Sequence, residues 1–365
     1  MTRATLVKIW IQDPSTSLGF GKILCHQPVQ PGPEDPEIRI CPAQGPVRAN
    51  DSQNFDFDPD EHPDAFRAAH CYGVARIVVD WAKNWEVRCV ASANALQGFV
   101  WEQQSPETAS PLEIYPDAGH CADACQLSLY SPQSRSIRLL SFTQNDGAGS
   151  RELFAAHSFD IVAHEVGHAV LDALLGRRLQ RWDSPDEVAA IKESFADLTV
   201  VLSFLSRTSL CEALLLEARG RDLLSARFLT EFAEEVAVAK TGKRYGIRVL
   251  DDRVWVGRRF GSRHQQSLLI TSPIVRAIES TFHKRQAHRL GREDAVLLHA
   301  IGEELTDAVV TGFLNVAPEE RYLAGVARSI LDCLGPALRR EVYTYFEEAF
   351  GDNLHRDCRG TSRFH

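Results

Sequence analysis

The spacing of apolar residues separates a first half with strand-like segments from a second half with helical periodicity. Runs that are rich in β-branched and aromatic residues, or that alternate apolar and polar positions, favour strands. Such runs occur at Thr5–Ile11, Glu37–Cys41, Val87–Phe99, Gln126–Tyr130 and Ser136–Phe142. Apolar residues three and four positions apart predict one long helix among them, at Asp64–Trp85.

Helical periodicity dominates the chain beyond residue 159. The helices that it predicts are Phe159–Gly176, Val188–Leu205, Leu210–Gly220, Leu223–Lys240, Ser272–Arg289, Arg292–Leu314, Pro318–Leu334 and Pro336–Phe350. Between them, Thr241–Gln266 has no periodicity and is rich in Arg, Gly and Asp. Long irregular segments of this kind are often functional, so this one is a candidate to carry part of a site.

Strands followed mainly by helices predict an α+β fold. The chain has 365 residues, of which 44% are hydrophobic, and this is enough for one large two-lobed domain or for two domains. We expect a β-rich extension at 1–55, an α/β lobe at 56–180, a helical lobe at 181–351 and a polar tail at 352–365.

The helix predicted at Phe159–Gly176 carries the clearest chemistry of the chain. Its centre reads HEVGH, from His164 to His168. Residues four apart on a helix lie on one face, so the two imidazoles can share one metal ion. Glu165 follows the first histidine and can act on a water bound to that ion. This is the HExxH spacing of zinc hydrolases, and the alternative is an amphipathic helix with two histidines at its polar edge.

A carboxylate on the next predicted helix favours the metal site over that alternative. Ser184, Pro185 and Glu187 form a capping box with proline at the first helical position. The helix that starts there places Glu193 and Asp197 on one face, because they are four residues apart. Glu193 completes a His, His, Glu set that can hold Zn²⁺ and leave its fourth position to water. Asp197 can accept the second ring N–H of a ligand histidine and so fix its tautomer.

Two other segments have residues that can bind metals. His120, Cys121 and Cys125 could belong to a second metal site, but they show no fourth ligand nearby, and ordinary loop and core thiols are the alternative. The acidic segment at 49–62 could be imagined as a calcium loop, but its spacing fits no EF-hand, so we interpret it as a solvated linker.

The charge and the cysteines of the chain bear on its expected cellular location and on the kinds of partner that it binds. The net charge is −9 with mixed signs throughout, which does not indicate a nucleic-acid-binding face. No segment resembles a signal peptide, and none reaches the roughly 18 consecutive apolar residues that span a bilayer. The nine cysteines are odd in number and scattered, which indicates free thiols in a reducing compartment. We therefore expect a cytoplasmic protein without a membrane partner.

The sequence HEVGHAVLDAL followed by ESFAD resembles the zinc motifs of the thermolysin-like metallopeptidases, the gluzincins. Ala69–Trp85 looks like the long helix of that family's N-terminal lobe, Asp160 occupies a family position, and the pattern around Phe346–Gly351 is similar too. The resemblance implies a divergent, intracellular member with a two-lobed zincin fold. In that fold an N-terminal lobe with a mixed β-sheet and helices ends in the zinc helix, a mainly α-helical lobe follows, and the active-site cleft lies between them.

The resemblance also implies two further site residues. The segment RHQQS, which contains His264, looks like the one that holds the family's second catalytic histidine. In that role His264 would stabilise the oxyanion of the reaction. The segment IRVLD, which contains Arg248, looks like the one whose arginine grips the substrate backbone. Both residues could instead be ordinary charged groups of a loop.

Four departures from the family pattern concern substrate binding, catalysis and calcium. The asparagine expected near Gln126–Tyr130, which pairs with the substrate backbone, is absent. The tyrosine expected about three turns past His168 is absent too. Arg259 stands where a carboxylate should orient the second histidine, and the acidic calcium cluster after Asp197 is mostly missing.

These observations favour a zinc-dependent endopeptidase that hydrolyses polypeptides, with Glu165 activating the zinc-bound water. A zinc aminopeptidase or another amide hydrolase is the first alternative, although no motif for binding a free amino terminus is evident. The second alternative is a degenerate zinc-binding scaffold that binds a protein partner. The sequence does not reveal the oligomeric state.

Overall fold

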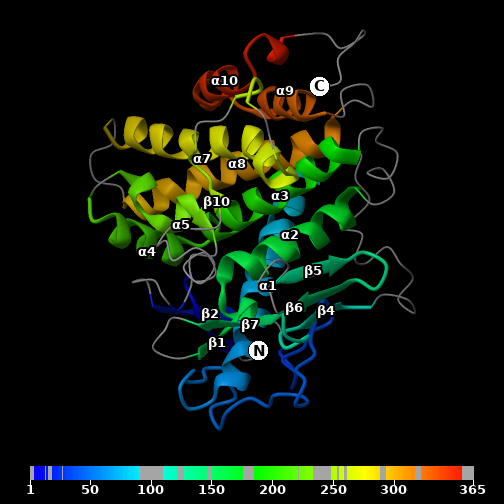
Figure 1. Ribbon diagram of the computed structural model, residues 1–365. Helices are drawn as coiled ribbons and strands as arrows, with labels where there is room; N and C mark the ends of the chain where they lie inside the picture. Colours follow the sequence, from blue (N-terminus) through cyan, green and yellow to red (C-terminus); the bar gives the residue numbers. More distant parts are fainter. Residues whose placement is uncertain are drawn as a thin grey trace. The chain divides into compact units, whose positions relative to one another are not determined.

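The computed structural model (Figure 1) describes residues 4–355 apart from 13, 15–18, 27, 91–109, 122–126, 146–149, 176–184, 221, 233–247, 253–254, 259–260, 288–292 and 317–321. It contains helices together with small sheets, so the α+β class predicted from the sequence is confirmed. The chain divides into two compact units. The first comprises Met1–Ala173 and Glu231–Val249, and the second comprises Leu174–Thr230 and Leu250–His365.

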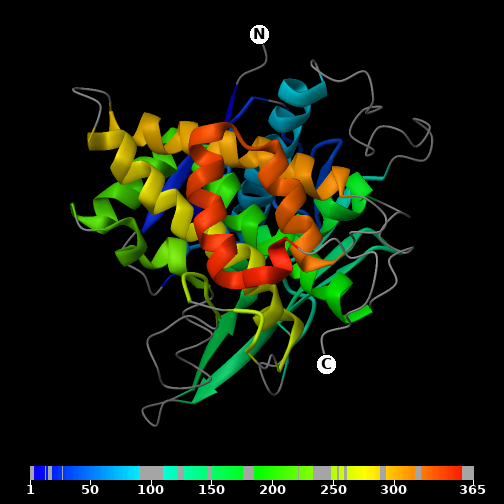
Figure 2. The ribbon, with the colours of Figure 1, turned by 90° about the horizontal axis from the view of Figure 1, so that it is seen from above.

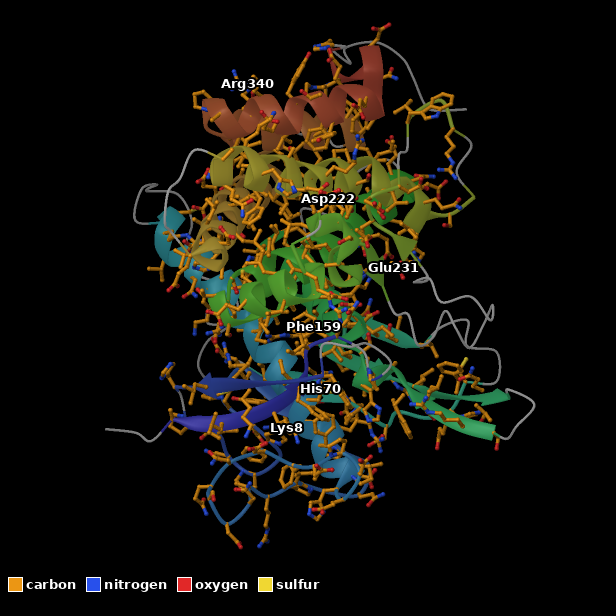
Figure 3. The ribbon with its side chains drawn as sticks, turned by 90° about the vertical axis from the view of Figure 1, so that its left-hand side faces the viewer. Lys8, His70, Phe159, Asp222, Glu231 and Arg340 are labelled. Carbon is orange, nitrogen blue, oxygen red and sulfur yellow. The ribbon has the colours of Figure 1, made fainter. Side chains whose placement is uncertain are left out.

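A β-hairpin packs against a long helix in the first unit. These elements are β1 (Thr5–Trp10), β2 (Phe20–Cys25) and α1 (Pro63–Val90). Figure 3 labels Lys8 on β1 and His70 on α1. Alternate residues of β1, among them Val7 and Ile9, are buried toward the helix. A Cβ atom added to Gly73 of α1 would lie only 2.5 Å from Cγ2 of Ile9, so glycine permits the close approach of helix and strand.

A buried ionic network joins α1 to the segment that precedes the next strand. The Arg76 guanidinium, with a side chain that is 1% exposed, contacts carboxylate oxygens of Asp35 at 3.1 Å, Glu37 at 2.7 Å and Asp80 at 2.8 Å. The Tyr72 hydroxyl donates to the same Asp35 oxygen at 2.6 Å. Because a buried charge is tolerated only when it is paired and hydrogen-bonded, these contacts fix the segment to the helix.

A four-stranded mixed sheet is the largest sheet of the first unit. Its strands are β3 (Ile38–Ile40), β4 (Leu112–Tyr115), β5 (Ser128–Ser131) and β6 (Ser136–Leu139). The spatial order is β3-β4-β6-β5. The strands β3, β4 and β6 run parallel, and β5 pairs antiparallel with β6. The strand β5 therefore stands at one edge, and Ser128 and Tyr130 lie on the same face of it.

A second hairpin leads into the helix that carries the HEVGH sequence. It consists of β7 (Ser141–Asn145) and β8 (Ser150–Phe154), and the helix is α2 (Phe159–Leu175). The strand predicted at Ser136–Phe142 is thus split at Leu140 into β6 and β7, which belong to different sheets.

The second unit is mainly helical. Its longer helices are α3 (Pro185–Leu205), α4 (Thr208–Ala218), α7 (Arg263–Ala287), α8 (Asp294–Asn315), α9 (Leu323–Cys333) and α10 (Pro336–Phe350). Shorter turns are η3 (Leu223–Ser225), α5 (Arg227–Thr230) and η5 (Gly351–Leu354). The helix α7 packs against α3, α8 and α10, and α9 lies beside α8 and α10 (Figure 2).

Two predicted elements are wrong where the structure describes them. The strand predicted at Val87–Phe99 is helical as far as Val90, because α1 continues five residues past Trp85, the predicted end of the helix. Residues 91–99 lie outside the described part. The helix predicted at Leu223–Lys240 is replaced by η3, α5 and the short strand β9 (Glu231–Phe232). The strand β9 pairs with β10 (Arg248–Val249), a long-range contact that local periodicity does not reveal.

The helix predicted from Ser272 begins nine residues earlier, at Arg263. Proline is unfavourable in a helix interior, yet Pro273 lies inside α7. Near this proline, the Ser272 hydroxyl donates to the carbonyl of Asp252 at 2.6 Å and the Thr271 hydroxyl to that of Ser267 at 3.2 Å. The bond to Asp252 is a tertiary contact that anchors α7 next to its interior proline.

Across the described residues, no single helix is long and apolar enough to cross a membrane. One pair of helices, Asp186–Leu205 and Thr208–Ala218, passes the same test jointly on length and composition, with a bend of 96° between them.

Candidate metal centre

The helix α2 is positioned by a local capping motif and by its apolar face. Ser158 has an extended backbone, and its hydroxyl accepts the backbone N–H of Ile161 at 3.4 Å, the place of an N-cap. Asp160 lies in the first turn, where a carboxylate is favourable to the helix dipole. Val162 and Val166 are fully buried. The opposite side of the helix is left for the residues with metal-binding chemistry.

His164 and His168 lie one turn apart on α2, and their Nε2 atoms are 3.1 Å from each other. The two rings meet edge to face, with centroids 4.7 Å apart. Two imidazole nitrogens that share a tetrahedral zinc ion at about 2.0–2.1 Å are separated by roughly 3.3 Å. The geometry of the pair is therefore close to that required for one shared ion.

Glu165 is a buried carboxylate beside this pair, with 7% of its surface exposed. The hydroxyl of Ser128, on the edge strand β5, donates to its Oε1 atom at 2.6 Å. A short bond to a charged acceptor is stronger than one between neutral groups. The carboxylate that the sequence proposes as a base is thus held by a specific partner in the sheet.

A second contact links the same strand to the same helix. The Tyr130 hydroxyl donates to Oδ2 of Asp172 at 3.2 Å. Burial, together with the nearby Asp172 carboxylate, raises the pKa of Tyr130, so its hydroxyl stays protonated and able to donate. Ser128 and Tyr130 are two apart on β5, and Glu165 and Asp172 are two turns apart on α2. Two residues on one face of β5 therefore contact two residues on one side of α2.

Glu193 lies on α3 with 4% of its surface exposed. Its Oε1 atom is 2.9 Å from Nε of Arg263, and its Oε2 atom is 2.9 Å from Nδ1 of His264. Both partners belong to the first turn of α7. The buried carboxylate of Glu193 is therefore held between two residues at the start of α7.

Hydrogen bonds fix the beginning of α7 against α3. The Ser194 hydroxyl donates to the carbonyl of Ser267 at 3.1 Å, and the Ser267 hydroxyl lies 3.2 Å from Oδ2 of Asp197. Asp197 is fully buried. Glu193 and Asp197 thus face the same turn of α7, as their spacing of four predicts.

His164, His168 and Glu193 form a group with metal-binding chemistry. His164 and His168 belong to the first unit and Glu193 to the second, and the three are a candidate set of metal ligands. Two imidazoles and one carboxylate make up one of the three-ligand sets of catalytic zinc sites. The donor set and the spacing of the two Nε2 atoms fit Zn²⁺.

The remaining predicted residues are only partly described. His264 does not lie in a loop before a helix, as expected, but in the first turn of α7, with 39% of its side chain exposed. Arg248 belongs to β10 and pairs with Phe232 in β9, which places its backbone but not its side chain. Arg259 lies outside the described residues.

Two other groups of ligating residues differ from this site. His120 contacts hydroxyls, Ser141 at 3.3 Å and Thr143 at 3.5 Å, and Cys125 lies outside the described residues, so the predicted second metal site is untested. Asp222 (labelled in Figure 3), Glu279 and His283 also bring ligand atoms within 4.8 Å of one another, but none of the three is buried. Exposed acidic groups of this kind are common without a metal.

Sequence reasoning missed two residues that contact the candidate site, Ser128 and Arg263. Ser128 is 37 positions before Glu165, and no periodicity relates a strand to a helix at that separation. Because Ser128 lies in a predicted strand, the sequence indicates only which face of that strand it occupies. Arg263 directly precedes His264, but it counted as a loop residue because the start of α7 was placed too late.

A scan against models of protein families finds no match to this chain. A search of curated proteins finds no match either.

Proposed function

We propose that the protein is a zinc-dependent metalloendopeptidase and a divergent relative of the thermolysin-like family. The group formed by His164, His168 and Glu193, with the buried carboxylate of Glu165 beside it, carries this proposal. A protein that only binds zinc has no need of a general base next to its ligands. An enzyme is therefore favoured over the degenerate scaffold, and the fold would be the two-lobed zincin arrangement that the resemblance implies.

The three ligands would hold a zinc ion, which when bound lowers the pKa of a water ligand toward neutrality and polarises the substrate carbonyl. Glu165 would take the proton of the attacking water and pass it to the leaving amine. Its burial supports this role, because a desolvated carboxylate is a better-positioned base than one surrounded by bulk water. Asp197 would accept the N–H of a ligand histidine and hold its tautomer.

Two further residues would act on the substrate. His264 would donate a hydrogen bond to the oxygen on which negative charge develops. Arg248 would bind the substrate backbone through its guanidinium. A polypeptide is the proposed substrate, and the cytoplasm is the proposed location.

Cleavage of a peptide library by zinc-loaded protein tests the proposal. We expect cleavage within peptide chains, its loss on chelation and its return with added zinc. The matched control is Glu165→Gln, which keeps the shape of the side chain but cannot take a proton. It should retain zinc and lose about two to four orders of magnitude in turnover, the usual share of a general base. Equal cleavage by this variant, or none by the wild type, contradicts the proposal.

A further inference from the structure

The Glu165 carboxylate takes one hydrogen bond from the part of the chain that the structure describes. It comes from the Ser128 hydroxyl, at 2.6 Å from Oε1. A hydroxyl beside an ionised carboxylate can only donate to it, so the direction of the bond is fixed. The bond engages one lone pair of Oε1, so Oε2 is the oxygen with more remaining capacity to accept a proton.

The position of Ser128 is itself fixed by two independent anchors. In the sheet, Ser128 is paired with Leu139 of β6, within a register of four residue pairs. Two residues on, Tyr130 bonds to Asp172 of α2. Leu129, between them, points to the other face of the strand and is 49% exposed. The pairing of β5 with β6 and the bond from Tyr130 to Asp172 therefore fix the position of the Ser128 hydroxyl next to α2.

We infer that Ser128 is a positioning residue for Glu165, an inference that rests on the proposed function. The hydroxyl holds the carboxylate in one rotamer with Oε2 directed at the water that is to be deprotonated. The same bond persists when Glu165 carries the proton on Oε2, so the acid that protonates the leaving amine keeps the same orientation. A catalytic group that is misplaced by about 1 Å can lose a hundredfold in rate, so a single oriented bond has a measurable effect.

Three variants of β5 test this inference. Ser128→Ala should lower kcat and kcat/KM together by about ten- to a hundredfold, with KM, zinc content and Tm unchanged. Ser128→Thr keeps a hydroxyl on a residue that strands accept, and it should restore most of the rate. Ser131→Ala is the matched control, because it removes a hydroxyl of the same strand that contacts Gln133 and not Glu165; it should keep the wild-type rate.

Crystal structures of the wild type and of Ser128→Ala give a readout that does not depend on activity. We expect the Glu165 carboxylate to keep its bond to Ser128 in the wild type and to turn away in the variant. If the wild type cleaves peptides and Ser128→Ala cleaves them equally well, the inference is wrong and the proposed function stands. If the wild type cleaves none, the proposed function fails, and the two crystal structures alone decide on the positioning: an unmoved Glu165 in Ser128→Ala overturns it.

Discussion

Nδ1 of His264 lies 2.9 Å from Oε2 of Glu193, the carboxylate that we propose as the third zinc ligand. The contact places a carboxylate of α3 beside the ring of His264, in the first turn of α7. This contact gives His264 the orienting carboxylate that the sequence pattern lacks at Arg259.

Replacing His264 by alanine should therefore lower kcat and kcat/KM together by about a hundredfold or more, with KM little changed, as the loss of one oxyanion donor does. The matched control is His283→Ala, which removes an exposed histidine farther along the same helix and should leave kcat close to the wild type. Steady-state kinetics with zinc determination on both variants make the comparison. Loss of zinc from His264→Ala would show that the residue serves the metal site and not the oxyanion.

Glu193 and Asp197 should respond differently to truncation. Glu193→Ala removes a ligand and should abolish stoichiometric zinc binding. Asp197→Ala removes a buried acceptor that contacts Ser267, and it should weaken zinc binding by about ten- to a hundredfold without abolishing it. Titration with a competing chelator measures both. Equal zinc affinity in the two variants would show that the roles of the two carboxylates are assigned wrongly.

Two buried histidines of the first unit should make the protein sensitive to acid. Burial lowers the pKa of both His70 and His157 to about 3. His70 also accepts the backbone N–H of Trp10 on Nδ1, at 3.1 Å, and protonation would break that bond. Because the folded state holds both rings neutral, the unfolded chain takes up more protons below about pH 6.5. Stability is then full above pH 6.5 and falls as the pH drops toward 3.

The slope should be at most about 1.4 kcal/mol per pH unit for each histidine. His157→Phe retains an aromatic ring next to Phe154 and Phe66 but cannot titrate. Urea unfolding of this variant and of the wild type at pH 7 and pH 5 should show a smaller loss in the variant. Equal losses would mean that His157 is already protonated in the folded protein, or that it is not buried in solution.

The buried network around Arg76 should be sensitive to the loss of one partner. Asp35→Ala leaves the guanidinium without its fully buried carboxylate, and breaking a buried pair costs about 3–5 kcal/mol. The ion pair between Lys22 and Asp56 offers a control, because Lys22 is 54% exposed and Lys22→Ala should cost less than about 1 kcal/mol. Denaturant unfolding measures both. Similar losses in the two variants would show that water reaches Arg76.

Much of the helical part of the fold was predictable, because long amphipathic segments with clear ends dominate it. The helix α10 has the predicted bounds Pro336–Phe350, with proline at its start and Gly351 after its end. The strand β2 was missed, since the run Phe20–Cys25 contains glycine and lysine and its pairing with β1 depends on residues some fifteen positions away. The start of α7 was predicted too late because its first residues, Arg263–Gln266, were assigned to the irregular segment Thr241–Gln266.

In the candidate site, the residues on single helices were predictable and the contacts between elements were not. Spacing alone placed His164 and His168 on one face of α2, and the 3.1 Å between their Nε2 atoms confirms that geometry. Nothing local to the sequence connects Ser128 to Glu165, because a strand edge and a helix meet only through the tertiary fold. The chemistry of the group remains a prediction from motifs.

The strand β3 and the residues before it are built into the first unit. β3 pairs in parallel with β4 inside the mixed sheet, and Asp35 is buried against Arg76 of α1. After a cut within this N-terminal stretch, the two pieces would stay associated. Removal of the whole stretch would take an edge strand from the sheet and leave the buried Arg76 guanidinium without Asp35. Limited proteolysis that removes this stretch should therefore lower the stability of the first unit.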